Sequence, residues 1–599
     1  MKAGRTMIFA AAVALAACSD SGTPPVQPGE KPVAAAAEQR DYGAELLALT
    51  NAHIAELVQE QPYLQMMSGM KVKALPDNSI AGAQRQARSA QARLDQLAAI
   101  DSSQLSHDDQ LTYSMFQGVL QQTVEAEQHF WHKFNVTPYA VGLTFSTVMP
   151  GVLASATFSS DEDIADYLGF LEDVGRYLED DLARLKGQEE RGILLPQAAL
   201  PGALTTIGNL GPAIASLTVM TPERLTALDQ EQQARLSAGI EAAVGGRITP
   251  AIEALQAYLG DDYLARAPQA VGLSQYPGGL EAYRFASRRE TTMDLEPKLI
   301  HERGLQYMAE IKNEMAAIRK ELGFEGSQAE FHEQMRNDPR FYAKTPEEVA
   351  ERYMAYIERI EPHVADYFSV LPKAPYGVKR LDPAAEPGMT FGYYQAPNPA
   401  QPVGNYRFNG SKLESRPMVW TGALIYHELV PGHHFHIALQ QENEDFSQFR
   451  KNTGLMYAAF TEGWANYAAS LSYEMGIMDD PWDRYGWLLF NAFITNRLVV
   501  DTGMNALGWS LEEARDYMME NTFSSEEEVA TETLRYSTDM PAQALAYKLG
   551  YEKIREIRGQ QEEKLGEAFD IKKFHAATVG SGAMPMPLLE THVDWYMAQ

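Results

Sequence analysis

The segment Tyr426-His427-Glu428-Leu429-Val430-Pro431-Gly432-His433-His434 combines a helix-like stretch with candidate metal ligands, and the predicted function depends on it. About thirty residues later comes Phe460-Thr461-Glu462-Gly463-Trp464-Ala465. A catalytic zinc ion takes three protein ligands, often two histidines and a glutamate, and keeps one position open. The usual His-Glu-x-x-His motif places both imidazoles one helical turn apart. In this chain the second histidine comes two or three residues late.

Two histidines compete for the second ligand position. In a regular helix His434 would face the same way as His427 but lie roughly 10 Å further along the axis, whereas His433 would point away. Pro431 removes a backbone donor and Gly432 permits unusual dihedral angles, so a regular helix is not expected here. A local bulge that absorbs two residues would return His433 to the usual ligand position. We therefore predict His433 as the ligand, with His434 as the alternative.

Two glutamates complete the predicted site. Glu428 directly follows the first ligand, so we expect it beside the water on the metal, as general base. Glu462 lies in the apolar, helix-like stretch 455–471, where a carboxylate that faces the core needs a partner, and we predict it as the third ligand. The alternative interpretation is that Glu462 lies in an ordinary core helix and that the histidines lie on the surface of another helix. Four of the 13 histidines fall within ten residues of one another, which favours the metal site.

Further segments of the second half complete a recognisable set. They are Arg288 to Leu295, Tyr393-Tyr394 with Asn405 to Asn409, Arg497 to Gly503 with Gly508-Trp509-Ser510, and Arg535-Tyr536 with Pro541 to Tyr547. With the histidine segment, they resemble the DUF885 family of bacterial proteins, many of them lipoproteins, whose hallmark is His-Glu-x-x-Pro-Gly-His-His. The resemblance covers most of the chain after its N-terminal segment. It implies a mostly helical, zinc-dependent, peptidase-like protein, related in architecture to oligopeptidases with a deep substrate channel.

The chain departs from the family pattern at two positions. Where the family usually has Asp-Thr-Gly-Leu-His, this chain has Asp501-Thr502-Gly503-Met504-Asn505, so one possible catalytic or supporting imidazole is missing. Asparagine can form hydrogen bonds but cannot carry a proton. The family's Pro-Gly-Gln is here Pro541-Ala542-Gln543, a milder change. The departures allow an altered activity or substrate without loss of the metal.

Several other residues receive predicted roles in hydrolysis. A second donor is needed for the oxyanion besides the metal, and the phenols of Tyr536 and Tyr547 can donate without adding charge. We expect Asp501 to orient a histidine or an arginine. Each of these residues could equally belong to the core, because buried polar side chains with satisfied tips are common. The residues predicted to bind substrate or support the site are Tyr394, Arg497, Arg535 and Gln543.

The N-terminal segment is typical of a bacterial lipoprotein. Basic Lys2 and Arg5 precede an apolar run that is too short to span a bilayer and fits a signal peptide. Leu15-Ala16-Ala17-Cys18 resembles a lipobox, so we expect cleavage after residue 17, lipidation of Cys18 and a flexible tether over residues 18–40. An ordinary secretory signal is the alternative. The expected location is the periplasmic side of the cell envelope, on the outer rather than the inner membrane.

Composition narrows the class of partner. A net charge of −30 argues against binding to nucleic acid or to anionic lipid, which leaves the lipid anchor as the only expected membrane contact. The single cysteine excludes a disulfide framework. No second linker-like stretch interrupts residues 41–599, so one large domain is expected, and its oligomeric state stays open.

The fold class is predicted as mostly α. Helical spacing of apolar residues and good helix formers mark six stretches, namely 42–58, 83–100, 161–186, 222–259, 297–322 and 346–368. The exception is Met389 to Asn409, where Thr390 to Tyr394 and Asn405 to Phe408 are strand-like and flank a Pro/Gly-rich connection. This small β-hairpin near the metal site could hold an extended peptide at its edge, or could simply pack its own aromatic residues.

Together these observations predict a hydrolase with one zinc ion that cleaves amide bonds of peptides, short ones if the channel is closed. The intact Glu428 favours catalysis, because a structural zinc ion needs no base beside an open position. The alternative is a non-catalytic lipoprotein that binds peptides or supports an envelope complex and keeps a structural zinc ion. Hydrolysis of a non-peptide amide also remains open.

Overall fold

The computed structural model describes residues 40–383, 386, 392–398 and 401–599. Within it, residues 42–599 form one compact unit. Cys18, the signal segment, the tether up to residue 39, and Thr390 and Phe391 of the predicted hairpin lie outside the described residues. None of the helices in the described part of the chain combines the length and the apolar character that crossing a bilayer requires.

The unit is helical apart from one small sheet, which confirms the predicted fold class. Its first thirteen α-helices are α1 Tyr42–Glu60, α2 Pro62–Met67, α3 Ile80–Leu97, α4 His107–Ala126, α5 Pro138–Leu143, α6 Met149–Ser155, α7 Asp161–Glu189, α8 Leu200–Leu217, α9 Pro222–Leu225, α10 Gln230–Ala243, α11 Thr249–Tyr258, α12 Asp261–Arg266 and α13 Gly279–Thr291. The later ones are α14 Pro297–Glu321, α15 Gln328–Arg336, α16 Pro346–Tyr367, α17 Thr421–Glu428, α18 His433–Glu442, α19 Gln448–Asn452, α20 Ala458–Glu474, α21 Pro481–Ala506, α22 Leu511–Asn521, α23 Glu526–Leu534, α24 Leu545–Leu565, α25 Ile571–Thr578 and α26 Met586–Ala598.

Five of the six predicted helices agree with α1, α3, α7, α14 and α16 to within a few residues at each end. The prediction of one helix over 222–259 is wrong. Asp229 caps a new helix through a reciprocal capping box with Gln232, so the chain breaks between α9 and α10. A wider π-type turn, Val244–Ile248, then separates α10 from α11.

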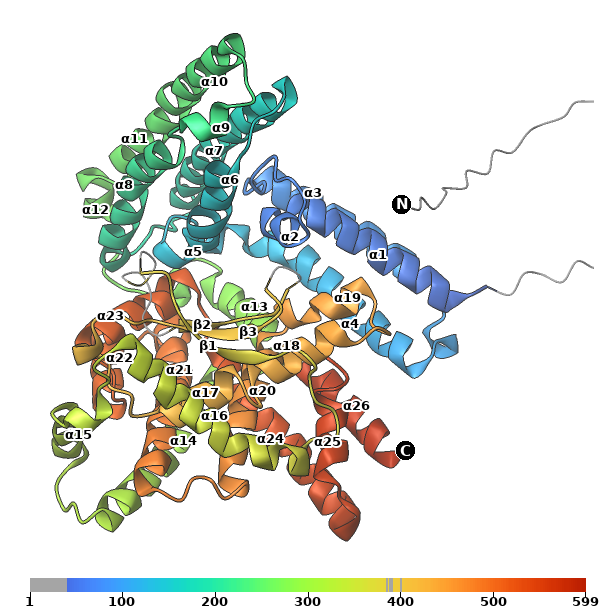
Figure 1. Cartoon of the computed structure of the whole chain (residues 1–599), viewed down its shortest axis with the longest axis vertical. Helices are drawn as coiled ribbons and strands as arrows, with labels where there is room; N and C mark the ends of the chain where they lie inside the picture. Colours follow the sequence, from blue (N-terminus) through green and yellow to red (C-terminus); the bar gives the residue numbers. More distant parts are fainter. Residues whose placement is uncertain (1–39, 384–385, 387–391, 399–400) are drawn as a thin grey trace, which may run out of the picture. The chain divides into compact units, whose positions relative to one another are not determined.

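The sheet contains one strand more than the predicted hairpin. β2 (Gly392–Gln395) pairs antiparallel with β3 (Gly404–Phe408), as expected for a hairpin, with Tyr394 opposite Tyr406. β1 (Tyr376–Arg380), which the sequence analysis missed, pairs parallel with β3, so β3 is central and β2 lies at an edge. Alternate residues of β3 are buried, and Tyr406 is fully buried. Figure 1 shows the sheet beside α16 and α18.

Two buried apolar clusters stabilise the unit. The larger joins α1, α3, α4, α14, α16 to α18 and α20 to α26, and the second is built mainly from α6, α7, α8, α10 and α11. Nearly every residue of α21 between Tyr485 and Asn505 is buried, and α14 packs along it. A helix that is buried on all sides in this way can position polar side chains without exposing them to solvent.

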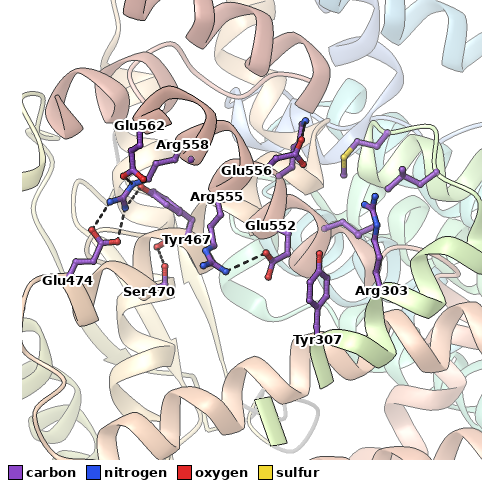
Figure 2. Close-up of a pocket in the computed structure, with 15 residues that line it drawn as sticks. Arg303, Tyr307, Tyr467, Ser470, Glu474, Glu552, Arg555, Glu556, Arg558 and Glu562 are labelled. Atoms are coloured by element: carbon purple, nitrogen blue, oxygen red, sulfur yellow. Dashed lines mark hydrogen bonds and ion pairs between the residues drawn. The ribbon is translucent and has the colours of Figure 1, made fainter. Parts of the chain in front are cut away.

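A cavity of about 570 Å³ opens between α14, α20 and α24 (Figure 2). Its lining is rich in charged side chains: Arg558 of α24 pairs with Glu474 of α20, and Arg555 pairs with Glu552 on the same helix. The histidines and Glu462 of the predicted metal site are not among its lining residues. The cavity is therefore not formed by the predicted metal ligands described next.

Candidate metal centre

The histidine segment forms two helices and not one. α17 ends at Glu428 and α18 begins at His433, and residues 429–432 connect them. The prediction of a bulge inside one continuous helix is therefore wrong, because the helix is interrupted. Glycine is required at Gly432, because a β carbon there would lie 1.9 Å from the carbonyl oxygen of His427. The indole N–H of Trp464 on α20 donates to the carbonyl oxygen of Pro431 at 3.1 Å and fixes the connection.

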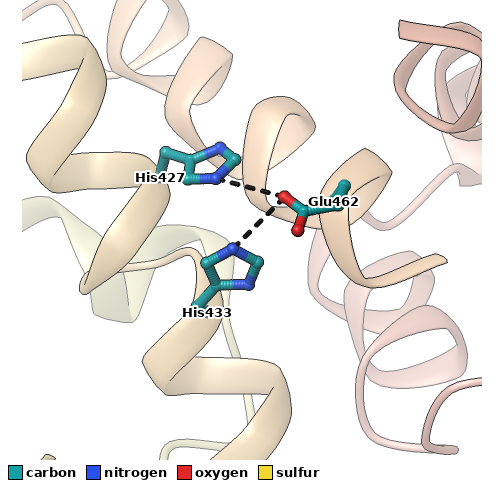
Figure 3. Close-up of side chains that lie close together, drawn as sticks. All are labelled: His427, His433 and Glu462. Carbon is teal, nitrogen blue, oxygen red and sulfur yellow. Dashed lines mark ion pairs between the residues drawn. The ribbon is translucent and has the colours of Figure 1, made fainter. Parts of the chain in front are cut away.

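The break brings three predicted ligands together. The Nε2 atoms of His427 and His433 each lie 3.4 Å from Oε2 of Glu462, which projects from α20 (Figure 3). The two imidazole ring centroids are 4.6 Å apart. One potential ligand atom from each of the three side chains lies within 4.8 Å of the other two, a spacing that could accommodate one metal ion.

The polar atoms of this cluster suit a cation. Among the described residues, Oε2 of Glu462 has no hydrogen-bond partner although it is buried. The outer nitrogen of each histidine is engaged: His427 Nδ1 lies 3.0 Å from Asn466 Oδ1, and His433 Nδ1 lies 3.0 Å from His436 Nε2. Asn466 Oδ1 can only accept, so His427 carries its proton on Nδ1 and directs the lone pair of Nε2 toward Glu462. The donor set therefore fits zinc.

The ionisable side chains of this cluster shift one another's pKa values. Burial alone would raise the pKa of Glu462, but the nearby His433 and His427 lower it well below its usual range. Burial would likewise lower the pKa of His433, and the carboxylate of Glu462 raises it instead. The lowered pKa of Glu462 and the raised pKa of His433 favour a carboxylate beside a protonated imidazole.

Glu428 lies next to the cluster without joining it. Burial raises its pKa, and Glu462 raises it further, whereas the two histidines lower it. The backbone N–H of Tyr394 on β2 donates to its carboxylate. As a whole residue, Glu428 is only partly buried. The edge strand of the sheet therefore orients the predicted general base.

His434 points away from the cluster. Its Nε2 donates to the carbonyl oxygen of Ala374 at 3.0 Å, and its Nδ1 accepts from the hydroxyl of Tyr394 at 3.0 Å. Burial lowers the pKa of His434 to about 4, so it is neutral at pH 7. Tyr394 thus contacts Glu428 through its backbone and His434 through its side chain, and its ring lies 6.4 Å from that of His433.

Tyr547 of α24 lies at the cluster. Its ring is nearly parallel to that of His427, with the centroids 6.5 Å apart. Burial raises the pKa of its hydroxyl, the charge of Glu462 raises it further, and a hydrogen bond from Gln543 lowers it. The structure thus places Tyr547 beside the predicted ligands and Gln543 at the hydroxyl of Tyr547.

Tyr536 belongs to a separate polar cluster. Its hydroxyl donates to Glu532 and accepts from Nε of Arg497 at 2.8 Å. Arg535 contacts both oxygens of Glu532 at 3.2 Å and donates to Oε1 of Gln543 at 2.6 Å. The guanidinium of Arg497 lies 4.5 Å from the ring centroid of Tyr547. This arginine cluster, consisting of Arg497, Arg535, Glu532 and Tyr536, adjoins the metal cluster through Tyr547 and Gln543.

The two departures from the family pattern have structural explanations. Asn505 is fully buried; its Nδ2 donates to the carbonyl oxygens of Asp501 and Tyr536, and its Oδ1 accepts from the N–H of Leu273. The carboxylate of Asp501 accepts from the N–H of Ala542 and from the hydroxyl of Tyr283, and not from a histidine or an arginine as we expected. Ala542 has a φ of 71°, which explains why glycine suits that position.

Two supporting residues were missed in the sequence analysis. Asn466 follows Glu462 by four positions, so both project from the same face of α20. His436 follows His433 by three positions on α18. Their helical spacing from predicted ligands was the available signal. Glu532, the counter-ion of both arginines, was also missed, although it precedes the predicted Arg535 and Tyr536 by three and four positions.

Comparisons with known proteins place the chain in a family. Residues 62–593 match the model of "Bacterial protein of unknown function (DUF885)". The match covers most of the chain, so the chain belongs to the DUF885 family, as the sequence resemblance predicted. No curated protein sequence matches it significantly.

Solved structures share the fold. The crystal structure of the putative lipoprotein from Colwellia psychrerythraea superposes with a TM-score of 0.81 at 24% identity, over 93% of this chain and 99% of that one. A putative lipoprotein of unknown function from Shewanella oneidensis gives a TM-score of 0.71 at 18% identity, over 91% and 99% of the two chains. At these identities the comparison establishes the helical fold and not the activity.

Proposed function

We propose that this member of the DUF885 family is a zinc-dependent hydrolase that cleaves amide bonds of peptides. One observation supports the proposal above the others: His427, His433 and Glu462 converge from three helices, with a buried oxygen of Glu462 that has no hydrogen-bond partner among the described residues. A buried carboxylate oxygen without a partner is costly, and a divalent cation would remove that cost.

The residues that would bind the ion are His427 through Nε2, His433 through Nε2 and Glu462 through its carboxylate. Asn466 and His436 would orient the two imidazoles from behind. A bound zinc ion would supply Lewis acidity, which polarises a substrate carbonyl and makes an attacking water more acidic.

Glu428 is the proposed general base. Burial raises its pKa, which brings its basicity closer to that of a group that exchanges protons near neutral pH. Its carboxylate would take a proton from the attacking water and pass it to the amine of the departing fragment. The Tyr394 N–H holds the carboxylate in place during both transfers.

Tyr547 is the proposed oxyanion donor. Its hydroxyl lies near Glu462, and its pKa is raised, so it stays protonated and can donate. Tyr536 does not suit this role, because its hydroxyl already donates to Glu532. We therefore propose Tyr547 as catalytic and Tyr536 as a support for Arg497.

The test compares the parent protein with Glu428→Gln. Zinc content is measured on both full-length proteins, and both are incubated with a mixed peptide library whose products are identified by mass spectrometry. We expect near-stoichiometric zinc in both and cleavage by the parent alone, because glutamine keeps the shape of the side chain but cannot accept the proton. A rate unchanged in Glu428→Gln would exclude the proposed base.

Other outcomes would lead to other functions. Zinc without cleavage by either protein would favour a non-catalytic peptide-binding or scaffold lipoprotein with a structural zinc ion, or a hydrolase of non-peptide amides. Absence of zinc from both proteins after incubation with zinc would refute the site itself.

We further propose that the protein acts in the cell envelope, anchored through lipidated Cys18 on the periplasmic side. The lipobox-like residues before Cys18 support this, and both structurally similar proteins are described as putative lipoproteins. Metabolic labelling with a fatty-acid analogue should mark the parent protein and not Cys18→Ala. Equal labelling of the two would refute the anchor.

A further inference from the structure

The arginine cluster beside the metal centre has an excess of positive charge. Two guanidinium groups, those of Arg497 and Arg535, share a single carboxylate, that of Glu532. Within the described residues, Glu532 is the one acid that forms an ion pair with either arginine. Burying a charge without a counter-ion is costly, so a cluster of this composition is suited to an additional anion.

The neighbouring carboxylates of Asp501, Asp539 and Glu528 form no ion pair with either arginine among the described residues. The carboxylate of Asp501 accepts from the Ala542 N–H and the Tyr283 hydroxyl, and that of Asp539 accepts from the Tyr139 N–H. Burial raises the pKa of Asp501 to about 7 and that of Asp539 to about 6. Asp501 and Asp539 each accept hydrogen bonds from groups other than the arginines.

The arginine cluster and the metal centre both retain partly exposed side chains. The side chain of Arg535 is 13% exposed, compared with 19% for Glu462. Tyr547 and Gln543, which connect the two clusters, are both half-buried. The hydroxyl of Tyr547 interacts with Glu462 on one side and with Gln543, Arg535 and Arg497 on the other. A ligand could therefore contact both clusters at once.

The cluster is also rigid. Arg497 packs against the rings of Phe493 and Tyr547, 4.5 Å from each ring centroid. Arg535 is fixed by its bonds to Glu532 and Gln543, and its guanidinium lies 5.5 Å from the ring of Tyr139. Arginine forks that are fixed in advance bind carboxylates with little loss of conformational entropy.

We infer that Arg535 and Arg497 form a subsite for the carboxylate of the substrate, and that this carboxylate is the free C-terminus of a peptide. The inference rests on the proposed peptidase function and adds an end preference to it. A free C-terminus is the anion that every unmodified peptide offers, whatever its sequence. The net charge of −30 makes the local positive charge distinctive for this chain.

The test uses three tripeptide probes whose carboxylate is at the C-terminus, absent, or on a glutamate side chain. They are N-acetyl-Ala-Ala-Ala as the free acid, the same peptide as its C-terminal amide, and N-acetyl-Ala-Glu-Ala amide, which has a side-chain carboxylate alone. Affinity is measured by calorimetry on full-length Glu428→Gln protein with zinc, and kcat/KM is measured on the parent. We expect the free acid to bind about 10- to 100-fold more tightly than the amide, as is typical of charge-assisted hydrogen bonds.

Two variants with opposite expected effects separate recognition from damage to the fold. Arg535→Gln should reduce the acid-to-amide affinity ratio to within about threefold of one. Glu532→Gln removes the competing carboxylate and should raise the ratio. Arg555→Gln is the matched control, because Arg555 is an exposed arginine paired with a glutamate in the cavity of Figure 2. It should leave the ratio unchanged.

Each remaining outcome decides one of the two proposals. Equal binding and cleavage of acid and amide would overturn the inference and leave the peptidase function standing. Preference for the Glu-containing amide over the free acid would overturn the C-terminal assignment. If no probe is cleaved, the peptidase function fails, and the affinity ratio alone still decides whether the arginine cluster binds a carboxylate. A ratio lowered equally by Arg535→Gln and Glu532→Gln would refute direct contact.

Discussion

Gly463 of α20 and Gly550 of α24 lie against each other so closely that neither has room for a β carbon. A β carbon on Gly463 would lie 2.5 Å from the carbonyl carbon of Gly550, and one on Gly550 would lie 1.9 Å from the carbonyl oxygen of Ala459. Glu462 and Tyr547 come from the same two helices, next to this crossing. The contact between the glycines therefore sets the distance between the predicted metal centre and its predicted oxyanion donor.

Gly550→Ala should destabilise the protein by at least about 2 kcal/mol, because the added methyl group meets backbone atoms that cannot move aside easily. It should also weaken zinc binding, since the helices must separate. The measurements are urea unfolding and zinc content. Gly559→Ala on the same helix is the control: nothing lies within 4 Å of a β carbon there, so it should raise stability by about 0.5–1 kcal/mol. Equal effects of the two substitutions would contradict the crossing.

Asn466→Ala should lower zinc affinity by about 10- to 100-fold, because the residue that orients His427 is lost. Asn466→Asp keeps an acceptor for the Nδ1–H and should bind zinc at least as tightly as the parent. Competition with a chelator measures both affinities, and unfolding without zinc controls for damage to the core. Parent-like affinity in Asn466→Ala would show that the hydrogen bond does not support the site.

Ala542→Gly should raise the free energy of unfolding by up to about 1 kcal/mol. The positive φ of Ala542 costs an L-residue roughly 1–2 kcal/mol, and the greater freedom of glycine in the unfolded chain offsets about half of that. Ala309→Gly, at an exposed position inside α14, is the control, and its free energy of unfolding should fall by about 1 kcal/mol. A decrease of similar size in the free energy of unfolding of Ala542→Gly would mean that the positive φ of Ala542 causes no strain.

Much of the site could be predicted from the sequence, because its ligands lie in short motifs. The separation of His427 from His433 predicted that these two histidines approach each other, but not the break between α17 and α18. That break depends on Trp464, which is more than thirty residues away, and on Gly432 packing against a carbonyl. β1 was missed because its pairing with β3 is parallel and joins distant residues. The arginine cluster likewise depends on tertiary contacts, chiefly those of Glu532 on α23 with Arg497 on α21.

Asp181 of α7 should make stability fall as the pH rises. It is 2% exposed, and burial raises its pKa to about 8 in the folded protein, against about 4 in an unfolded chain. The folded state therefore retains a proton that the unfolded state releases between these values. The resulting loss of stability starts near pH 4 and is complete above pH 8.

Asp181→Asn removes this dependence and keeps a side chain that can contact Asn78. Relative to the parent, its free energy of unfolding should rise between pH 5 and pH 8, by at most about 1.4 kcal/mol per pH unit. Urea unfolding across this range measures the difference. Asp262→Asn, at an exposed position on α12, should give the same difference at both ends of the range. If the difference in free energy of unfolding between Asp181→Asn and the parent does not change with pH either, the raised pKa of Asp181 is contradicted.

His433→Gln and His434→Gln should separate metal binding from positioning. His433 directs Nε2 toward Glu462, so His433→Gln should bind zinc at least about tenfold more weakly than the parent. His434 contacts Ala374 and Tyr394 instead, so His434→Gln should keep its zinc. Because Tyr394 also orients Glu428, His434→Gln should lower kcat more than it raises KM. Zinc titration and steady-state kinetics on both variants give the answer. Loss of zinc in His434→Gln with retention in His433→Gln would reverse the assignment of the second ligand.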